Sequence, residues 1–209
     1  MVVTAYQQAQ REGQSVVRAA ILDAAKRLLV TEGPAALTVR RISGEVGCST
    51  KVIYTLFGGK DGLGEALWLE GFARFEQVLL SVPARDDPFE RLHLGLMAYR
   101  EYALSEPDYY RVMFQGALPG LNPSPEAVQA AKRTFGLLVR GVADCLDAGL
   151  LRGAEAVEIA DVLWMAVHGA VGLEISGFFD REVAGRRFRL LCVSVLTPFL
   201  ACDDERDPS

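Results

Sequence analysis

Apolar residues recur at helical spacing along most of the chain, and no stretch has the strict alternation of a β-strand. Val39, Ile42 and Val46 are spaced three and four residues apart, so they share one face of a helix. Thr38 stands in the position of an N-cap, and Gly47 stands where a helix can end with a positive φ. This pattern predicts a short helix over residues 39–46.

A second short helix is expected after a turn of three or four residues. Ser49 can cap it, and Val52, Ile53 and Leu56 form its apolar side. Two short helices joined by a glycine-containing turn make a helix-turn-helix unit. Polar and mainly cationic residues remain on its surface, and such groups suit phosphate oxygens and base edges. The candidate DNA-binding residues are Thr38, Arg40, Arg41, Ser49, Thr50, Lys51, Tyr54 and Lys60.

These candidates have different expected roles. Thr38 and Tyr54 suit phosphates, and either Arg40 or Arg41 could read a guanine. Residues 49–51 begin the second helix, so their amides and side chains would point toward a duplex. The alternative interpretation, a solvated face on a small helical domain, remains open from this pattern alone.

The rest of the chain is also predicted to be helical, which gives an all-α protein of about nine helices. Residues 1–14 are rich in Gln and aperiodic, and we expect them to form a mobile tail. An N-terminal three-helix domain is predicted over residues 15–62, and a larger helical domain over residues 63–202. The further helices are expected at 15–32, 63–80, 89–104, from Pro107, 124–148, 154–178 and 182–200, with Pro198 bending or ending the last.

An ordered run of residues extends through the helix-turn-helix and the helix before it: Ile21, Ala24, Ala25, Leu28, Gly33, Leu37, Thr38, Val39, Ile42, Gly47, Ser49, Tyr54, Phe57, Lys60 and Leu63. Through this run, from about Val16 to Trp68, the sequence resembles the N-terminal DNA-binding domain of the TetR (tetracycline-repressor-like) family of bacterial regulators. It departs from the family pattern at Ser43, Val46, Cys48, Leu56 and Gly58-Gly59, none of which removes a polar contact residue. The resemblance implies that residues 15–62 form a DNA-binding domain and residues 63–202 an effector-binding and dimerisation domain.

Charge is distributed unevenly along the chain. Residues 1–60 contain eight Lys or Arg and four Asp or Glu, a net charge of +4, whereas residues 61–209 contain 14 and 23, a net charge of −9. The total of −5 by itself argues against a nucleic-acid partner. A basic first part on an acidic remainder instead favours a DNA-binding protein with a separate sensing domain.

The spacing of the cysteines and histidines predicts neither a metal site nor a disulfide framework. Four cysteines are widely separated, without a CxxC pair, and only His93 and His168 are present. No pair suggests a nucleophile and its base, and residues 58–64 lack the spacing of a phosphate-binding loop. The apolar run at 162–173 is too short to span a membrane. We therefore expect a cytoplasmic protein that is not an enzyme and binds no cofactor or metal.

Aromatic residues at helical spacing suggest a binding site for a small molecule. The segment from Trp164 to Gly177 resembles the Trp-x-x-x-His-Gly segment of one branch of TetR C-terminal domains. Ordinary core packing is the alternative for these residues, and a buried Glu174 would need a partner. The candidate effector-binding residues are Trp68, Phe72, Phe75, Tyr99, Tyr102, Met113, Phe135, Trp164 and His168.

Small residues in the helix at about 154–178 and an apolar stripe in the helix at about 182–200 suit either core packing or self-association. The family resemblance favours a homodimer formed by these two helices, a palindromic DNA operator and a small-molecule effector. It therefore implies a ligand-responsive repressor. Two alternatives remain: an architectural or activating DNA-binding protein without an effector, and a helical ligand-sequestering protein with a vestigial helix-turn-helix.

Overall fold

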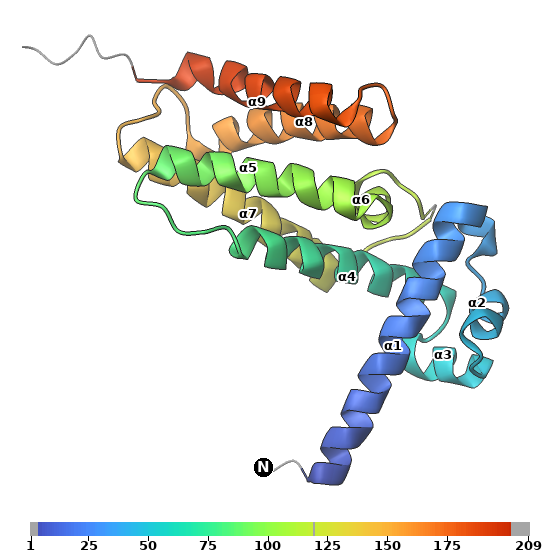
Figure 1. Cartoon of the computed structure of the whole chain (residues 1–209). Coiled ribbons are helices and arrows are strands. Elements are labelled where there is room, and N and C mark those ends of the chain that lie inside the picture. Colours follow the sequence, from blue (N-terminus) through green and yellow to red (C-terminus); the bar gives the residue numbers. More distant parts are fainter. Residues whose placement is uncertain (1–3, 119, 202–209) are drawn as a thin grey trace, which may run out of the picture. The chain divides into compact units, whose positions relative to one another are not determined.

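The computed structural model describes residues 4–118 and 120–201 (Figure 1). Within these residues the chain is all-α, with nine α-helices, two short 3-10 helices and one isolated bridge between Leu151 and Leu200. The predicted fold class is confirmed. The elements are α1 Ala5–Glu32, η1 Pro34–Ala36, α2 Val39–Val46, α3 Thr50–Phe57, α4 Lys60–Leu80, α5 Pro88–Ser105, α6 Pro107–Phe114, α7 Pro125–Asp147, α8 Ala156–Ile175, α9 Arg181–Leu196 and η2 Thr197–Phe199.

The chain forms two compact units. The first contains the chain up to Phe72 together with Asp108–Val128, so it combines α1, α2 and α3 with the first part of α4 and with α6. The second contains Ala73–Pro107 and the chain from Gln129 onward, and most of α5, α7, α8 and α9 belong to it.

Helix α1 begins ten residues earlier than predicted, so the expectation of a mobile tail is wrong from Ala5 to Gln14. Residues 1–3 lie outside the described residues. Thr4 and Gln7 form a capping box: the amide of Thr4 donates to Oε1 of Gln7 at 3.0 Å, and the amide of Gln7 donates to Oγ1 of Thr4 at 3.3 Å. Burial begins only at Ile21, so the first turns carry no apolar periodicity from which the helix could be recognised.

Local capping signals define α2 and α3. Oγ1 of Thr38 accepts a hydrogen bond from the amide of Arg41 at 3.2 Å, and Gly47 ends α2 with a φ of 72°. Both predictions are confirmed. Ser49 occupies the N-cap position of α3 as expected, but its side chain makes no capping hydrogen bond. Ser49 is exposed, so water can satisfy its hydroxyl group and the first amides of α3.

Helix α4 begins at Lys60, three residues before the predicted start, and packs closely against the end of α3. A Cβ atom at Gly62 would lie only 1.8 Å from the carbonyl oxygen of Phe57. Only glycine fits at this position without a shift of the backbone.

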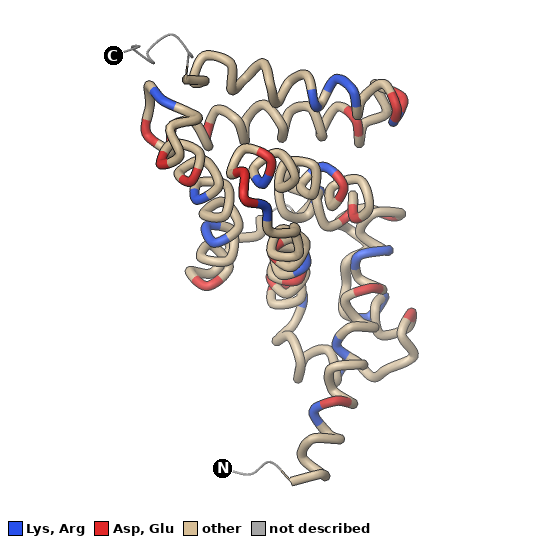
Figure 2. Tube along the Cα trace, turned by 60° about the vertical axis from the view of Figure 1, so that its left-hand side comes forward, with Lys and Arg blue, Asp and Glu red and all other residues tan. Residues whose placement is uncertain are grey.

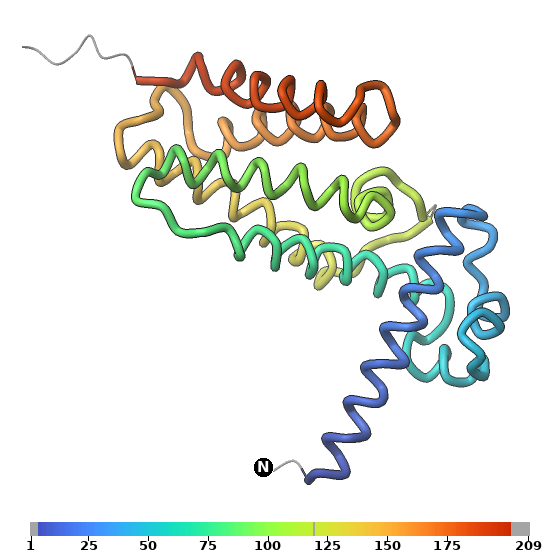
Figure 3. Tube along the Cα trace, viewed as in Figure 1, coloured from blue at the N-terminus to red at the C-terminus, as the bar shows by residue number. Residues whose placement is uncertain are grey.

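In the second unit, α8 and α9 form an antiparallel pair that packs on α5 through α8 (Figure 3). The guanidinium of Arg100 on α5 binds the carboxylate of Glu174 on α8 at two points, with Nε 2.9 Å from Oε2. Arg100 also donates to the carbonyl of Arg181 and lies 5.9 Å from the ring centroid of Phe188. Arg100 is therefore the partner that a buried Glu174 requires, and it joins three helices.

The last helix ends where proline predicts. Helix α9 stops at Leu196, and Pro198 lies in the 3-10 helix that follows. Proline cannot donate the amide hydrogen bond that would continue an α-helix, so the prediction for Pro198 is confirmed.

Candidate DNA-binding and effector-binding sites

The eight candidate DNA-binding residues lie at the ends and on the outer faces of α2, α3 and α4, and all eight are exposed. Tyr54 is 57% exposed, which is high for an aromatic side chain in the middle of a helix. Ile42 and Ile53, by contrast, are fully buried and hold the two helices together. The same short helices thus present polar groups outward on a rigid apolar support.

The structure distinguishes between the two candidate arginines on α2. Arg41 donates to Oε1 of Glu32 at 2.9 Å, and this bond raises the pKa of the Arg41 guanidinium above its usual value. No such pair with Glu32 involves Arg40, whose neighbouring position on the helix directs it elsewhere.

Three of the candidate effector-binding residues lie in the first unit. The rings of Trp68 and Phe72 are 4.3 Å apart, and Phe72 lies 5.3 Å from Phe114 in an edge-on arrangement. Met113 of α6 approaches Gly71 of α4, where an added Cβ atom would lie 2.8 Å from the sulfur. Trp68, Phe72 and Met113 thus belong to one cluster between α4 and α6.

The other six candidates lie in the second unit. Phe75 contacts Tyr99 and Tyr102, with ring centroids 5.4 and 5.0 Å apart. Trp164 lies 5.9 Å from Phe135 and 5.4 Å from the ring of His168. The structure therefore brings each of these residues into aromatic contact with at least one other candidate.

His168 provides a polar group within the second cluster. The hydroxyl group of Tyr99 and Nδ1 of His168 share a hydrogen bond of 2.9 Å. Burial lowers the pKa of the His168 imidazole below 6.5, so the ring is neutral at pH 7. A neutral imidazole has one nitrogen that donates a hydrogen bond and one that accepts.

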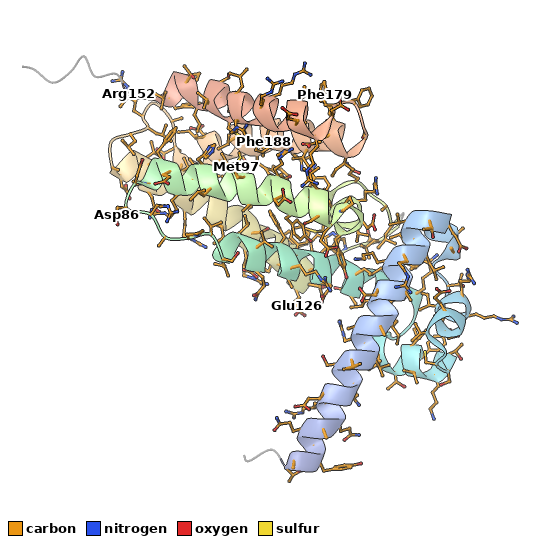
Figure 4. The ribbon with its side chains drawn as sticks, viewed as in Figure 1. Asp86, Met97, Glu126, Arg152, Phe179 and Phe188 are labelled. Atoms are coloured by element: carbon orange, nitrogen blue, oxygen red, sulfur yellow. The ribbon has the colours of Figure 1, made fainter. Side chains whose placement is uncertain are left out.

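An apolar groove of about 560 Å³ lies between α8 and α9, along the small residues and the apolar stripe that the sequence analysis noted in these two helices. Met165 and Leu190 on its rim are 60% and 66% exposed. Arg187 lies 4.7 Å over the ring of Phe179, and Figure 4 shows Phe179 at the surface and Phe188 directed inward. The groove is lined by, among others, Met165, Gly169, Leu173, Phe179, Arg187 and Leu190.

The outer side of α8 is apolar as well as its buried side. Figure 2 shows long stretches of α8 and α9 without charged residues. By length and composition α8 is the one helix among the described residues that could cross a membrane, and 28% of its most apolar stretch is buried in the structure. The sequence analysis expected this region to be too short to span a membrane because it considered only the uninterrupted apolar run 162–173, whereas α8 is 20 residues long. A soluble helix that is apolar on two sides passes the same test, so the result is weak evidence for a membrane span.

Two thiols lie in the interior of the second unit. Burial raises the pKa of both Cys145 and Cys192 to about 11, so both are protonated at neutral pH and poor nucleophiles. Among residues 4–118 and 120–201, no three His, Cys, Asp or Glu side chains are grouped so that they could hold a metal ion.

Comparison with known proteins assigns both parts of the chain. Residues 21–67 match the model of the bacterial regulatory proteins of the tetR family, and residues 92–195 match a tetracyclin repressor-like C-terminal domain. The chain belongs to the TetR family. The resemblance to the TetR family is thus confirmed, and the protein is a TetR-family transcriptional regulator with a DNA-binding helix-turn-helix domain.

Several relatives agree with this assignment. The chain is 21% identical over 211 residues to the HTH-type transcriptional regulator Rv1816 of Mycobacterium tuberculosis, covering 83% of this chain and 87% of that one. A protein of unknown function from Rhodococcus sp. RHA1 has the same fold, with a TM-score of 0.77, 23% identity, and coverage of 88% and 96%. The TetR family transcriptional regulator PfmR from Thermus thermophilus has a TM-score of 0.66, 20% identity, and coverage of 82% and 93%. TetR-family members are transcriptional regulators rather than enzymes.

Proposed function

We propose that this TetR-family protein is a cytoplasmic homodimeric repressor that binds a palindromic operator and is released by a small-molecule effector. The observation that carries the proposal is the exposed polar face of α2 and α3 on an apolar support, within the segment that matches the family's DNA-binding model. Helix α3 enters the major groove and α2 crosses the phosphate backbone.

Each DNA-binding residue has a role in this proposal. Lys51 and Thr50 at the start of α3 face base edges or nearby phosphates, and Tyr54 follows one turn later. Arg40 reads a guanine or binds a phosphate beside the groove. The remaining contacts, to phosphates, are assigned to Thr38, Arg41, Ser49 and Lys60.

Self-association through α8 and α9 is supported by the apolar groove and by its exposed rim. Leu190, Val193 and Met165 are 50–66% exposed. Monomeric soluble proteins rarely leave so many large apolar side chains exposed to water in one place. A second copy related by two-fold symmetry would cover this surface and place two helix-turn-helix units on one DNA site.

The effector is assigned to the candidate effector-binding residues, most of which are aromatic. The pair of Tyr99 and His168 supplies hydrogen-bonding groups beside aromatic rings, which suits an aromatic or otherwise largely apolar molecule with one polar group. Effector and DNA oppose each other if the effector favours a conformation in which the helix-turn-helix units do not match successive major grooves. A coupling of about 1–3 kcal/mol changes operator affinity roughly 5- to 150-fold.

Selection of genomic DNA fragments by the purified protein tests the proposal. A palindromic site recovered at moderate salt supports a dimeric regulator. Recovery of DNA without sequence preference favours an architectural protein, and recovery of none favours a sequestering protein.

Sedimentation tests the dimer interface. The Leu190→Asp variant should be a monomer, whereas Leu80→Asp, at a residue 62% exposed on α4, should leave the dimer intact. Equal behaviour of both variants would refute the assignment of the dimer interface.

A further inference from the structure

The first turns of α1 form a helix that buries none of its side chains. Residues 4–17 are all exposed, and burial in α1 begins at Ile21. Figures 1 and 3 show this part of α1 extending past α3 within the first unit. The match to the family's DNA-binding model also begins only at residue 21, so the extension is a feature that this model does not cover. At 1.5 Å per residue, the helix from Thr4 to Arg18 is roughly 21 Å long.

One contact defines which side of this extension faces α3. The guanidinium of Arg18 lies 5.2 Å over the ring of Phe57, the last residue of α3. Gln14, Arg11 and Gln7 precede Arg18 at intervals of four, three and four residues, so they continue the same face of the helix. We call Gln7, Arg11, Gln14 and Arg18 the donor stripe, because each of these side chains carries N–H groups.

The acidic residue of the extension lies off this stripe. Glu12 is about a third of a turn away from the line of the donor stripe and accepts a hydrogen bond from Nε2 of Gln8 at 3.2 Å. The opposite side of the helix carries Ala9 and Val16 instead, and Val16 is 70% exposed. Both arginines of the extension thus lie on the side that faces the end of α3, together with two of its four glutamines, whereas Gln8 and Gln10 lie off the stripe.

We propose that the donor stripe is a second DNA-binding element, which binds the phosphates of the duplex beside the base pairs under α3. Two observations support this occupant: the stripe runs on from the contact of Arg18 with Phe57 at the end of α3, and its donors and two cations complement phosphate oxygens. From Gln7 to Arg18 the stripe is roughly 17 Å long, which matches the axial rise of about five phosphates on one strand. The element extends the bound length of DNA without reading its sequence. The inference rests on the proposed DNA-binding role of α3.

The test compares two variants of the full chain that change net charge equally. Gln7→Glu/Gln14→Glu places two carboxylates on the donor stripe, and Ala9→Glu/Val16→Glu places two on the opposite face. Glutamate at position 7 can still complete the capping box with Thr4, and none of the four positions is buried, so both variants should fold. Far-UV circular dichroism and the urea midpoint verify this.

The probe is a duplex of arbitrary sequence and roughly 40 base pairs, titrated between about 50 and 200 mM salt, because phosphate contacts are independent of sequence. The stripe variant should bind at least about tenfold more weakly than the wild type, with a smaller salt dependence, since like charges then face the phosphates. The opposite-face variant should bind within about threefold of the wild type, since its charges are directed away from the duplex.

Equal weakening by both variants would overturn the inference, because it would reflect net charge alone. A Lys51→Ala variant separates this result from failure of the proposed function. If Lys51→Ala loses affinity and the stripe variant does not, the inference fails and α3 remains the DNA-binding element. If none of the variants changes DNA binding, the proposed function fails as well. Loss of self-association in sedimentation, caused by the stripe variant alone, would assign the stripe to a second copy and overturn the inference.

Discussion

Replacement of Glu174 by glutamine should destabilise the protein by about 3–5 kcal/mol, because it leaves the buried charge of Arg100 without its counter-ion. The side chains of Arg100 and Glu174 are only 13% and 5% exposed, so water cannot replace the missing partner. Arg100 also bonds the carbonyl of Arg181 and packs on Phe188, so any movement of its guanidinium disturbs α5, α8 and α9 together.

A neighbouring pair, which joins α5 to α9, provides the control. Glu101 and Arg181 are 2.9 Å apart, but their side chains are 61% and 67% exposed. Glu101→Gln should therefore cost about 0–1 kcal/mol. For a chain of this length, 3–5 kcal/mol corresponds to a decrease in Tm of roughly 6–20 °C, whereas the control should change Tm by no more than about 4 °C.

Urea unfolding followed by circular dichroism measures both effects. The protomer concentration is held fixed, because the stability of a dimer depends on it. If Glu174→Gln is no more destabilising than Glu101→Gln, the reasoning from burial is refuted. The double variant Arg100→Met/Glu174→Leu should be more stable than Glu174→Gln, since it removes both charges and not one.

Two further predictions concern a glycine and a histidine. Gly62→Ala should abolish DNA binding or unfold the first unit, because the added methyl group would meet the carbonyl of Phe57. Gly44→Ala on α2 places its methyl group in open space and should stabilise the protein by about 0.5–1 kcal/mol. Thermal unfolding and DNA titration compare the two variants. Burial keeps the pKa of His168 in the folded protein below the unfolded value of about 6.5. The unfolded chain therefore takes up the proton first on acidification, so the stability of the fold decreases as the pH drops below about 6.5. Urea midpoints measured from pH 7 downward should fall less steeply for His168→Gln, and equal slopes would contradict a lowered pKa.

Features encoded by neighbouring residues could be predicted from the sequence. Thr38 and Gly47 mark the ends of α2 because capping and positive φ are local requirements. The first turns of α1 were missed because a helix that buries nothing has no apolar period, and only the capping box of Thr4 and Gln7 signals its start.

Features that depend on distant residues were only partly predictable. Glu174 was expected to need a partner if buried, but Arg100 lies 74 residues away, and no local pattern identifies it. The exposure of Met165 and Leu190 was likewise hidden, because an apolar residue in a helix has the same sequence signal whether it faces the core or a partner.

The central claim, that α3 binds DNA, is tested most directly by anisotropy titrations of a selected genomic fragment with three proteins: the wild type, Lys51→Ala, and Lys132→Ala. Lys132 is likewise an exposed cation, on α7, and serves as the control. Lys51→Ala should bind at least about tenfold more weakly, with a salt dependence reduced by about 0.9 for each phosphate that the protein no longer binds, and Lys132→Ala should match the wild type. Wild-type affinity of Lys51→Ala, or equal weakening by both substitutions, would contradict the assignment of α3 as the DNA-binding helix.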